Sequence, residues 1–131
     1  MSLKFLLPSA ALAVVAAGVA TLPVEPARAA GPAANGAQLF AQRCQSCHTV
    51  VPGQKGVLAP NLSGVVGRKA ASTPQFNYSP ALKGSNVTWT RANLERFLQA
   101  PMRMVPGTRM VIAVPDAAQR GAILDYLATR R

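Results

Sequence analysis

Apolar residues recur at helical spacing in three segments of the chain. In the first segment, Gly36, Phe40 and Cys44 follow one another at intervals of four residues, so they share one face of a helix. Asn35, a residue type that favours the cap position, directly precedes them. The pattern therefore predicts a first helix over residues 36–47.

Two further helices are predicted in the last third of the chain. Thr90 favours the start of a helix over residues 91–99, and Pro101 ends it. Asp116 begins a capping-box pattern at the start of a last helix, which runs to about Thr129. The apolar stripes of these two helices comprise Leu94, Phe97 and Leu98 in one, and Ala122, Ile123, Tyr126 and Leu127 in the other.

The stretch between the first and second helices, residues 52–80, has no sustained period of 2 or 3.6. Glycine and proline interrupt it repeatedly. A loop of this length is uncommon in a compact domain unless a large bound group organises it. Because there is also no credible strand pair and no internal repeat, we expect an all-α domain with long loops wrapped around such a group.

The length of 131 residues allows one domain and a leader. Half of the residues are apolar and only 14% are charged, which argues against a low-complexity disordered chain. Residues 1–29 are typical of a secretory signal, with Lys4 in the basic region, an apolar stretch, and a small-x-small site over residues 27–29. We expect a signal peptide or an uncleaved membrane anchor over residues 1–29, followed by one domain over residues 30–131 outside the cytoplasm.

The charge balance is strongly basic, with 14 Lys and Arg against 4 Asp and Glu and a formal net charge of +10. Lys4, Glu25 and Arg28 fall in the leader, so the domain that follows keeps a charge of +9. Such an excess predicts attraction to an anionic partner. The basic residues form no run and no nucleic-acid recognition motif, so an acidic protein face is favoured over nucleic acid.

The most specific motif is Cys44-Gln45-Ser46-Cys47-His48, the C-x-x-C-H spacing of c-type haem attachment. The two cysteines can each bond a haem vinyl group, while the adjacent histidine reaches the iron from the same side. A disulfide or a redox-active thiol pair would not need the histidine. A zinc site would need four ligands, and the chain has only two Cys and one His. We therefore interpret the motif as a haem site.

The second axial ligand of the iron is open from the residues alone. His48 is the only histidine, so a methionine, a lysine or an empty position remains. Met110 stands apart because it follows the turn-forming residues 106–109, which would project its side chain from a loop. Met102 and Met104 are better explained as packing or surface residues beside that turn.

These motifs, taken together, resemble a class I, mitochondrial-type cytochrome c over essentially the whole domain. His48 and Met110 are separated by the 62 positions that separate the axial ligands of that family. The residues that carry the resemblance are, in order, Gly36, Phe40, Cys44-x-x-Cys47-His48-Thr49-Val50, Pro60-Asn61-Leu62-x-Gly64, Gly67-Arg68-Lys69, Phe76-x-Tyr78, Val87-Thr88-Trp89, Pro106-Gly107-Thr108-Arg109-Met110, Ile123 and Tyr126.

The resemblance implies a small cytochrome c fold of three main helices and long loops around one covalent haem c. His48 and Met110 would be the two axial ligands, with Pro60 accepting a hydrogen bond from the histidine ring. Haem propionates would lie against Arg68, Tyr78 and Trp89. A contact between the first and last helices would involve Gly36, Phe40, Ile123 and Tyr126.

The function that the resemblance implies is that of a periplasmic one-electron carrier and not of an enzyme. Its partners would be acidic docking faces of redox proteins: a cytochrome bc-type complex, a terminal oxidase, a photosynthetic reaction centre or a periplasmic dehydrogenase. We expect a monomer, on the membrane only if the leader is retained. The basic residues placed to dock are Arg43, Lys55, Arg103 and Arg109, whereas Val57 and Met102 stand where the family often has Lys.

The alternative is a small haem peroxidase or gas-binding protein with a labile sixth ligand. The family places a tyrosine near the methionine sulfur, and this chain has Phe97 there, which would remove a hydrogen bond beside Met110. The lack of a second histidine, a usual distal acid or base, argues against this alternative.

Overall fold

The computed structural model describes residues 32–131, so the predicted leader over residues 1–29 lies outside the described residues. Within them the secondary structure is helical, apart from one isolated bridge between Lys69 and Thr88. None of these helices is long and apolar enough to cross a bilayer. The helices are α1 (Pro32–Arg43), α2 (Pro80–Gly84), α3 (Arg91–Gln99), α4 (Pro101–Met104) and α5 (Ala117–Ala128). The predicted all-α class is confirmed, and α1, α3 and α5 are the three longer helices.

Helix α1 differs from the prediction of 36–47 at both ends. It begins at Pro32, because proline suits the first turn of a helix, and Asn35 lies inside it rather than capping it. At the other end, the amide of Gln45 donates to Phe40 O, five residues back, at 3.0 Å. This shift breaks the regular ladder after Arg43, so the Cys-x-x-Cys segment forms a turn beyond the helix.

Helices α3 and α5 have the predicted starts because their caps are made by the expected side chains. Thr90 Oγ1 accepts from the amide of Asn93 at 3.2 Å, and Asp116 Oδ1 accepts from the amide of Gln119 at 2.7 Å. Helix α3 ends at Gln99, and α4 starts directly at Pro101. Local sequence signals therefore determine both helix starts.

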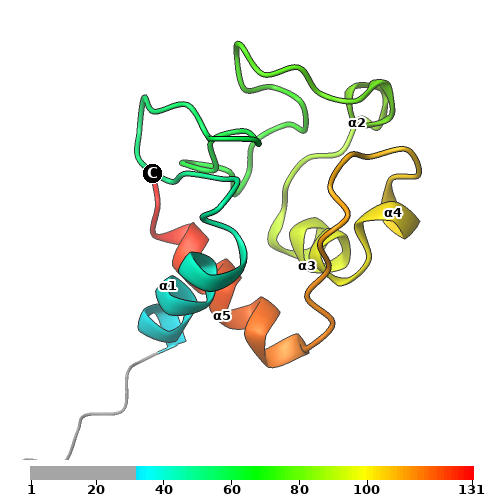
Figure 1. Cartoon of the computed structure of the whole chain (residues 1–131). Coiled ribbons are helices and arrows are strands. Elements are labelled where there is room, and N and C mark those ends of the chain that lie inside the picture. Colours follow the sequence, from blue (N-terminus) through cyan, green and yellow to red (C-terminus); the bar gives the residue numbers. More distant parts are fainter. Residues whose placement is uncertain (1–31) are drawn as a thin grey trace, which may run out of the picture.

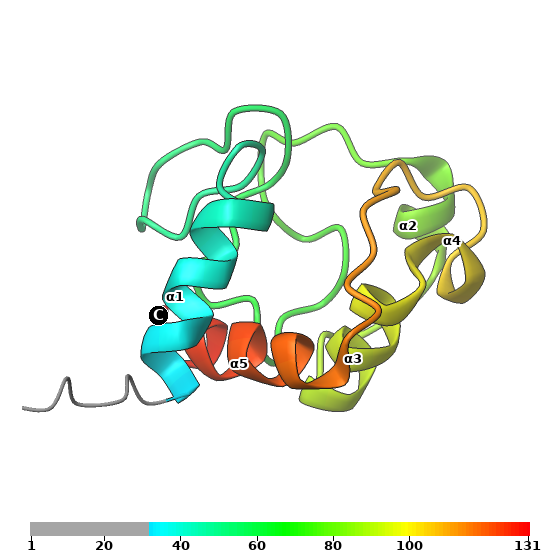
Figure 2. The same ribbon diagram turned by 60° about the horizontal axis from the view of Figure 1, so that its bottom comes forward.

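The core of the fold is organised by the crossing of α1 and α5, which lie side by side in both views (Figures 1 and 2). The rings of Phe40 and Tyr126 are 5.5 Å apart, and Ile123 is fully buried. A Cβ atom on Gly36 would lie only 1.9 Å from the backbone oxygen of Ala122, so the two helices approach as closely as glycine allows. The predicted contact between first and last helices is confirmed.

Helices α2, α3 and α4 lie on the opposite side of the molecule from α1, and residues 44–79 run between the two groups (Figure 1). Figure 2, with the bottom of the molecule turned forward, shows the path of the chain as a circuit. The chain runs from α1 through this segment and α2 to α3 and α4, and it returns along residues 105–116 to α5. Three backbone bonds tie the long segment to the residues before α3: Trp89 N donates to Arg68 O at 2.8 Å, Gly67 N to Trp89 O at 2.9 Å, and Ala70 N to Val87 O at 2.8 Å.

Candidate functional site

The two cysteines lie on the turn that continues from α1. The amide of Cys44 donates to Phe40 O at 2.8 Å, and the amide of His48 donates to Cys44 O at 2.9 Å, so the turn keeps an almost helical path. Both thiols are free and half-buried. Burial raises the pKa of Cys44 to about 11, partly offset by the nearby positive charge of Arg43. The pair is therefore two separate thiols, as attachment to two vinyl groups requires, and no disulfide.

The His48 ring is held by one backbone carbonyl. Its Nδ1 lies 2.8 Å from Pro60 O, and the ring is half-buried. A carbonyl can only accept, so Nδ1 carries the hydrogen and Nε2 keeps its lone pair. Burial lowers the pKa of His48, and the bond to Pro60 acts in the opposite direction. The contact implied by the resemblance is present, and it leaves a neutral ring with one nitrogen free to bind a metal.

Pro60 is followed by Asn61, whose side chain holds the loop around it. No role of Asn61 was predicted from the sequence. Asn61 Nδ2 lies 2.7 Å from Val51 O and 2.6 Å from Gln54 O, and Asn61 Oδ1 accepts from Ser63 N at 2.6 Å. One side chain thereby joins the two ends of the loop that starts after the cysteine turn. No motif would have revealed this role, because the loop brings the three partners together only when folded.

We expect Asn61→Ala to reduce the free energy of unfolding by roughly 2 kcal/mol, since three hydrogen bonds of about 1 kcal/mol each are lost and water replaces part of them. Guanidinium unfolding of the haem-loaded protein measures this. The control is Asn93→Ala, which removes the single side-chain bond from Nδ2 to Thr88 O. A loss for Asn61→Ala no larger than that of the control would contradict the assigned role.

Arg68 and its neighbours present hydrogen-bond donors without an acidic partner. Arg68 is half-buried, and its Nη1 and Nη2 donate to Ser63 O and Asn61 O at 2.8 Å each. Burial lowers its pKa, whereas the neighbouring Tyr78 acts to raise it. No carboxylate of the described residues pairs with this cation. A half-buried guanidinium of this kind is stabilised by an anion brought by a ligand.

Two aromatic residues complete this group. Tyr78 and Trp89 are both largely buried, but the Tyr78 hydroxyl and the Trp89 indole N–H are not among the fully enclosed polar atoms, so both donors can be reached by a ligand. Their rings pack on other aromatics: Tyr78 lies 4.7 Å from Phe76, and Trp89 lies 4.9 Å from Phe97, measured between centroids. The three predicted residues therefore offer one cation and two spare donors.

A hollow of about 450 Å³ opens beside Arg68, and its lining includes Pro60, Thr73 and Phe76. The hydroxyl of Thr73 is the one buried side-chain polar atom of the described residues that lacks a hydrogen-bond partner. A buried hydroxyl without a partner, beside a guanidinium without a carboxylate partner, fits a ligand that carries carboxylates, as haem does with its propionates. Thr73 could not be predicted from the sequence, because a single loop threonine carries no signal.

Met110 lies on the segment between α4 and α5. It is half-buried and packs against the same core cluster as Cys44. The turn before it is made by Gly107, whose φ of +88° favours glycine, and by the buried Thr108. Arg109 Nη1 then donates to Asn77 O at 2.7 Å, which ties the turn to the loop before α2. The side chain is therefore presented from a braced loop, as predicted.

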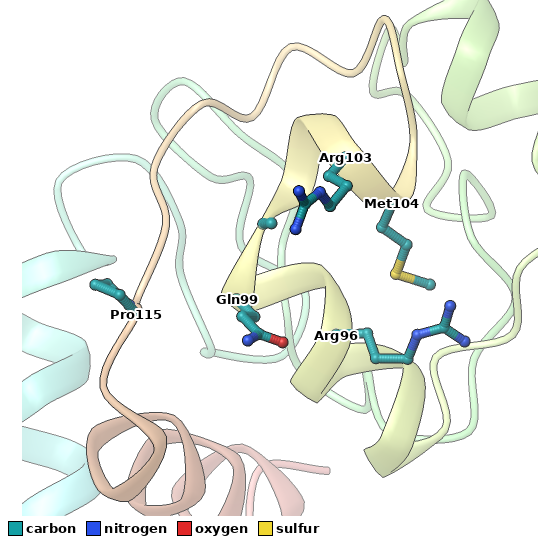
Figure 3. Close-up of a pocket in the computed structure, with 6 residues that line it drawn as sticks. Arg96, Gln99, Arg103, Met104 and Pro115 are labelled. Atoms are coloured by element: carbon teal, nitrogen blue, oxygen red, sulfur yellow. The ribbon is translucent and has the colours of Figure 1, made fainter.

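Met102 and Met104 lie in α4 and not on a loop, although Met104 is half-buried and packs against the same core cluster as Met110. Met102 is 51% exposed, and Met104 lines a surface hollow of about 410 Å³ between α3, α4 and the segment through Pro115 (Figure 3). The side chains of Arg96 and Arg103 border this hollow, and none of the predicted haem ligands lines it. It is therefore separate from the candidate site.

The docking residues predicted from the sequence all lie on the surface. Arg43, Lys55, Arg103 and Arg109 are exposed. Val57 and Met102, which stand where the resembling family often has lysine, are apolar and 74% and 51% exposed. Within residues 32–131, no three His, Cys, Asp or Glu side chains gather as a zinc ion would require, so the zinc alternative has no ligand set there.

Comparisons with known proteins point to one family. The family model described as cytochrome c matches residues 33–131. Cytochrome c2 of Rhodomicrobium vannielii is 40% identical over 92% of this chain and 96% of that protein. Cytochrome c2 of Rhodoblastus acidophilus is 40% identical over 66% of this chain and 81% of its own length. Among solved structures, cytochrome cH from Methylobacterium extorquens matches with a TM-score of 0.68 and 39% identity, over 74% of this chain and 97% of that one.

Proposed function

Because this chain belongs to the cytochrome c family, as a bacterial class I member, we propose that His48 and Met110 are the two axial ligands of its haem iron. The chain is a monohaem c-type electron carrier, not an enzyme, and its cofactor is one covalent haem c. The observation that carries the ligand proposal is the His48–Pro60 hydrogen bond of 2.8 Å, which leaves Nε2 of the ring free.

The bound haem supplies a one-electron iron couple, and the residues of this chain hold it in place. The thiols of Cys44 and Cys47 would each add across a vinyl group of the haem to form a thioether bond. Arg68, Tyr78 and Trp89 would hold the propionates through their remaining N–H and O–H donors. A thioether ligand from Met110 favours ferrous iron and fills the sixth position, which disfavours turnover of a substrate.

The absorption spectrum of the oxidised and reduced protein, produced where c-type haem is attached, tests this proposal. We expect a low-spin reduced spectrum and, in the oxidised protein, the weak far-red band of a bond between methionine sulfur and ferric iron. A high-spin spectrum, or a shift on adding carbon monoxide, would show an open sixth position. That result would overturn the ligand proposal in favour of a gas-binding or peroxidase-like site.

Electron transfer would take place in the periplasm, after removal of the leader over residues 1–29, with redox proteins that present acidic faces. The proposed partners are a cytochrome bc-type complex, a terminal oxidase, a photosynthetic reaction centre or a periplasmic dehydrogenase. The exposed cations Arg43, Lys55, Arg103 and Arg109 and the overall basic charge support this proposal. Charges of this kind act mainly on the rate of encounter, so their effect should depend on salt.

We therefore expect the double variant Arg43→Glu, Lys55→Glu to react about tenfold more slowly than the wild type with a bacterial terminal oxidase at low ionic strength. The difference should shrink as salt screens the charges. Stopped-flow oxidation of the reduced protein measures the second-order rate constant. The charge-matched control is the double variant Arg130→Glu, Arg131→Glu, which reverses two exposed charges elsewhere on the chain. Equal slowing by the control would show a net-charge effect without a docking face.

A further inference from the structure

Arg120 is a buried arginine of α5 whose contacts reach beyond the helix. Only 6% of the residue is exposed. Its Nε lies 2.7 Å from Glu95 Oε1 on α3. Its Nη1 donates to two backbone oxygens, Val114 O at 2.8 Å and Pro115 O at 2.6 Å. One guanidinium therefore joins α5, α3 and the segment that leads from Met110 into α5.

That segment has an anchor on each side of Met110 and exposed residues close behind it. Before Met110, Arg109 is bound to Asn77 O at 2.7 Å. After it, Val111 and Ile112 are 67% and 54% exposed. The next fixed point is Val114, which is buried and donates from its amide to Leu98 O at 2.7 Å. Because Val111 and Ile112 are exposed, the next restraint on the chain after Met110 is the hold on residues 114 and 115.

We propose that Arg120 is a positioning residue that holds Met110 in place as the sixth ligand, by clamping the carbonyls of Val114 and Pro115. The inference rests on the proposed ligand role of Met110. A buried guanidinium needs partners for its donors, and Glu95 pairs only Nε. The two carbonyls pair Nη1, so the segment cannot move away without leaving these donors of a buried cation without partners.

A second ion pair joins the same two helices without reaching the segment after Met110. Arg91 Nη1 on α3 lies 2.8 Å from Asp125 Oδ1 on α5, with both side chains largely exposed to solvent. Its guanidinium also makes a long bond of 3.4 Å to Gly121 O on α5, and no bond to the segment after Met110. Arg91 therefore joins α3 to α5 without touching the ligand segment, which makes it the matched control for Arg120.

The test measures how readily imidazole displaces the sixth ligand from the oxidised, haem-loaded protein. In Arg120→Lys the charge is kept, but one ammonium cannot make all three contacts, and we expect the apparent imidazole affinity to rise about tenfold. The far-red band should weaken in parallel. Arg120→Gln should show a larger rise. Arg91→Gln should bind imidazole as the wild type does, and Glu95→Gln, which keeps an acceptor for Nε and leaves both carbonyl bonds, should change the affinity less than twofold.

The outcomes separate this inference from the proposed function. Wild-type imidazole affinity and an unchanged far-red band in Arg120→Lys would overturn the positioning role, as would an equal effect in Arg91→Gln. A wild-type protein without the far-red band would instead overturn the ligand role of Met110. If Arg120→Gln does not fold, Arg120→Lys and Glu95→Gln decide the question, and unfolding curves of each variant separate loss of global stability from release of the ligand.

Discussion

Replacing Met110 by alanine is expected to abolish the far-red band of the oxidised protein and to lower its reduction potential markedly. The thioether stabilises ferrous over ferric iron, so its loss favours the oxidised form. Axial ligands set haem potentials over roughly 0.8 V, and the fall should be a substantial part of that range. The open position should then bind carbon monoxide in the reduced protein. Absorption spectroscopy and a redox titration measure both effects.

The chain provides its own controls for this substitution. Met102 is half exposed on α4, and Met104 lines the separate surface hollow (Figure 3). Met102→Ala and Met104→Ala should keep the far-red band and change the potential little. If one of these two variants loses the band while Met110→Ala retains it, the ligand has been assigned to the wrong methionine.

Gly36→Ala is expected to destabilise the fold by about 3 kcal/mol, the upper part of the range for overpacking. The added Cβ would lie 1.9 Å from Ala122 O, 2.7 Å from Ala122 C and 2.8 Å from Tyr126 Cβ. Two of these atoms belong to the backbone of α5, so relief requires the two helices to separate. Separation would also loosen the contact between the Phe40 and Tyr126 rings. Chemical unfolding of the haem-loaded protein measures the loss.

Gly121→Ala is the matched control, with the opposite sign expected. Gly121 lies inside α5, and nothing stands within 4 Å of a Cβ atom built on it. Alanine has the higher helix propensity, so the substitution should stabilise the protein by about 0.5 to 1 kcal/mol. Equal destabilisation by both substitutions would mean that the close approach at Gly36 does not limit the helix crossing.

The elements predicted well are those whose signals are local. Thr90 and Asp116 cap their helices within three residues, so the starts of α3 and α5 follow from the sequence alone. The first helix was misplaced because Asn35 is as good a cap in sequence as Thr90. Only the structure shows that Pro32 begins the helix and that Gln45 departs from its ladder.

The candidate site also contains residues that were predicted from the sequence and residues that were not. Cys44, Cys47 and His48 lie within five residues, so one motif contains them. The family resemblance implied the roles of Pro60, Arg68 and Met110. The residues that hold these groups were not predicted. Asn61 and Arg120 act through backbone carbonyls, and any residue can supply a carbonyl. Contacts of this kind leave no pattern of side-chain types, and they become visible only when distant segments are brought together.

The crossing of α1 and α5 also determines the order of events in folding. Residues 44–116 separate the two helices, so their contact closes a loop that contains nearly the whole domain. Loop closure of this length is slow compared with forming either helix. Gly36 and Phe40 cannot make their contacts with α5 until residues 117–128 have been synthesised. Until that contact forms, Cys44 is not yet packed against the core, so its thiol stays open to the bond with haem.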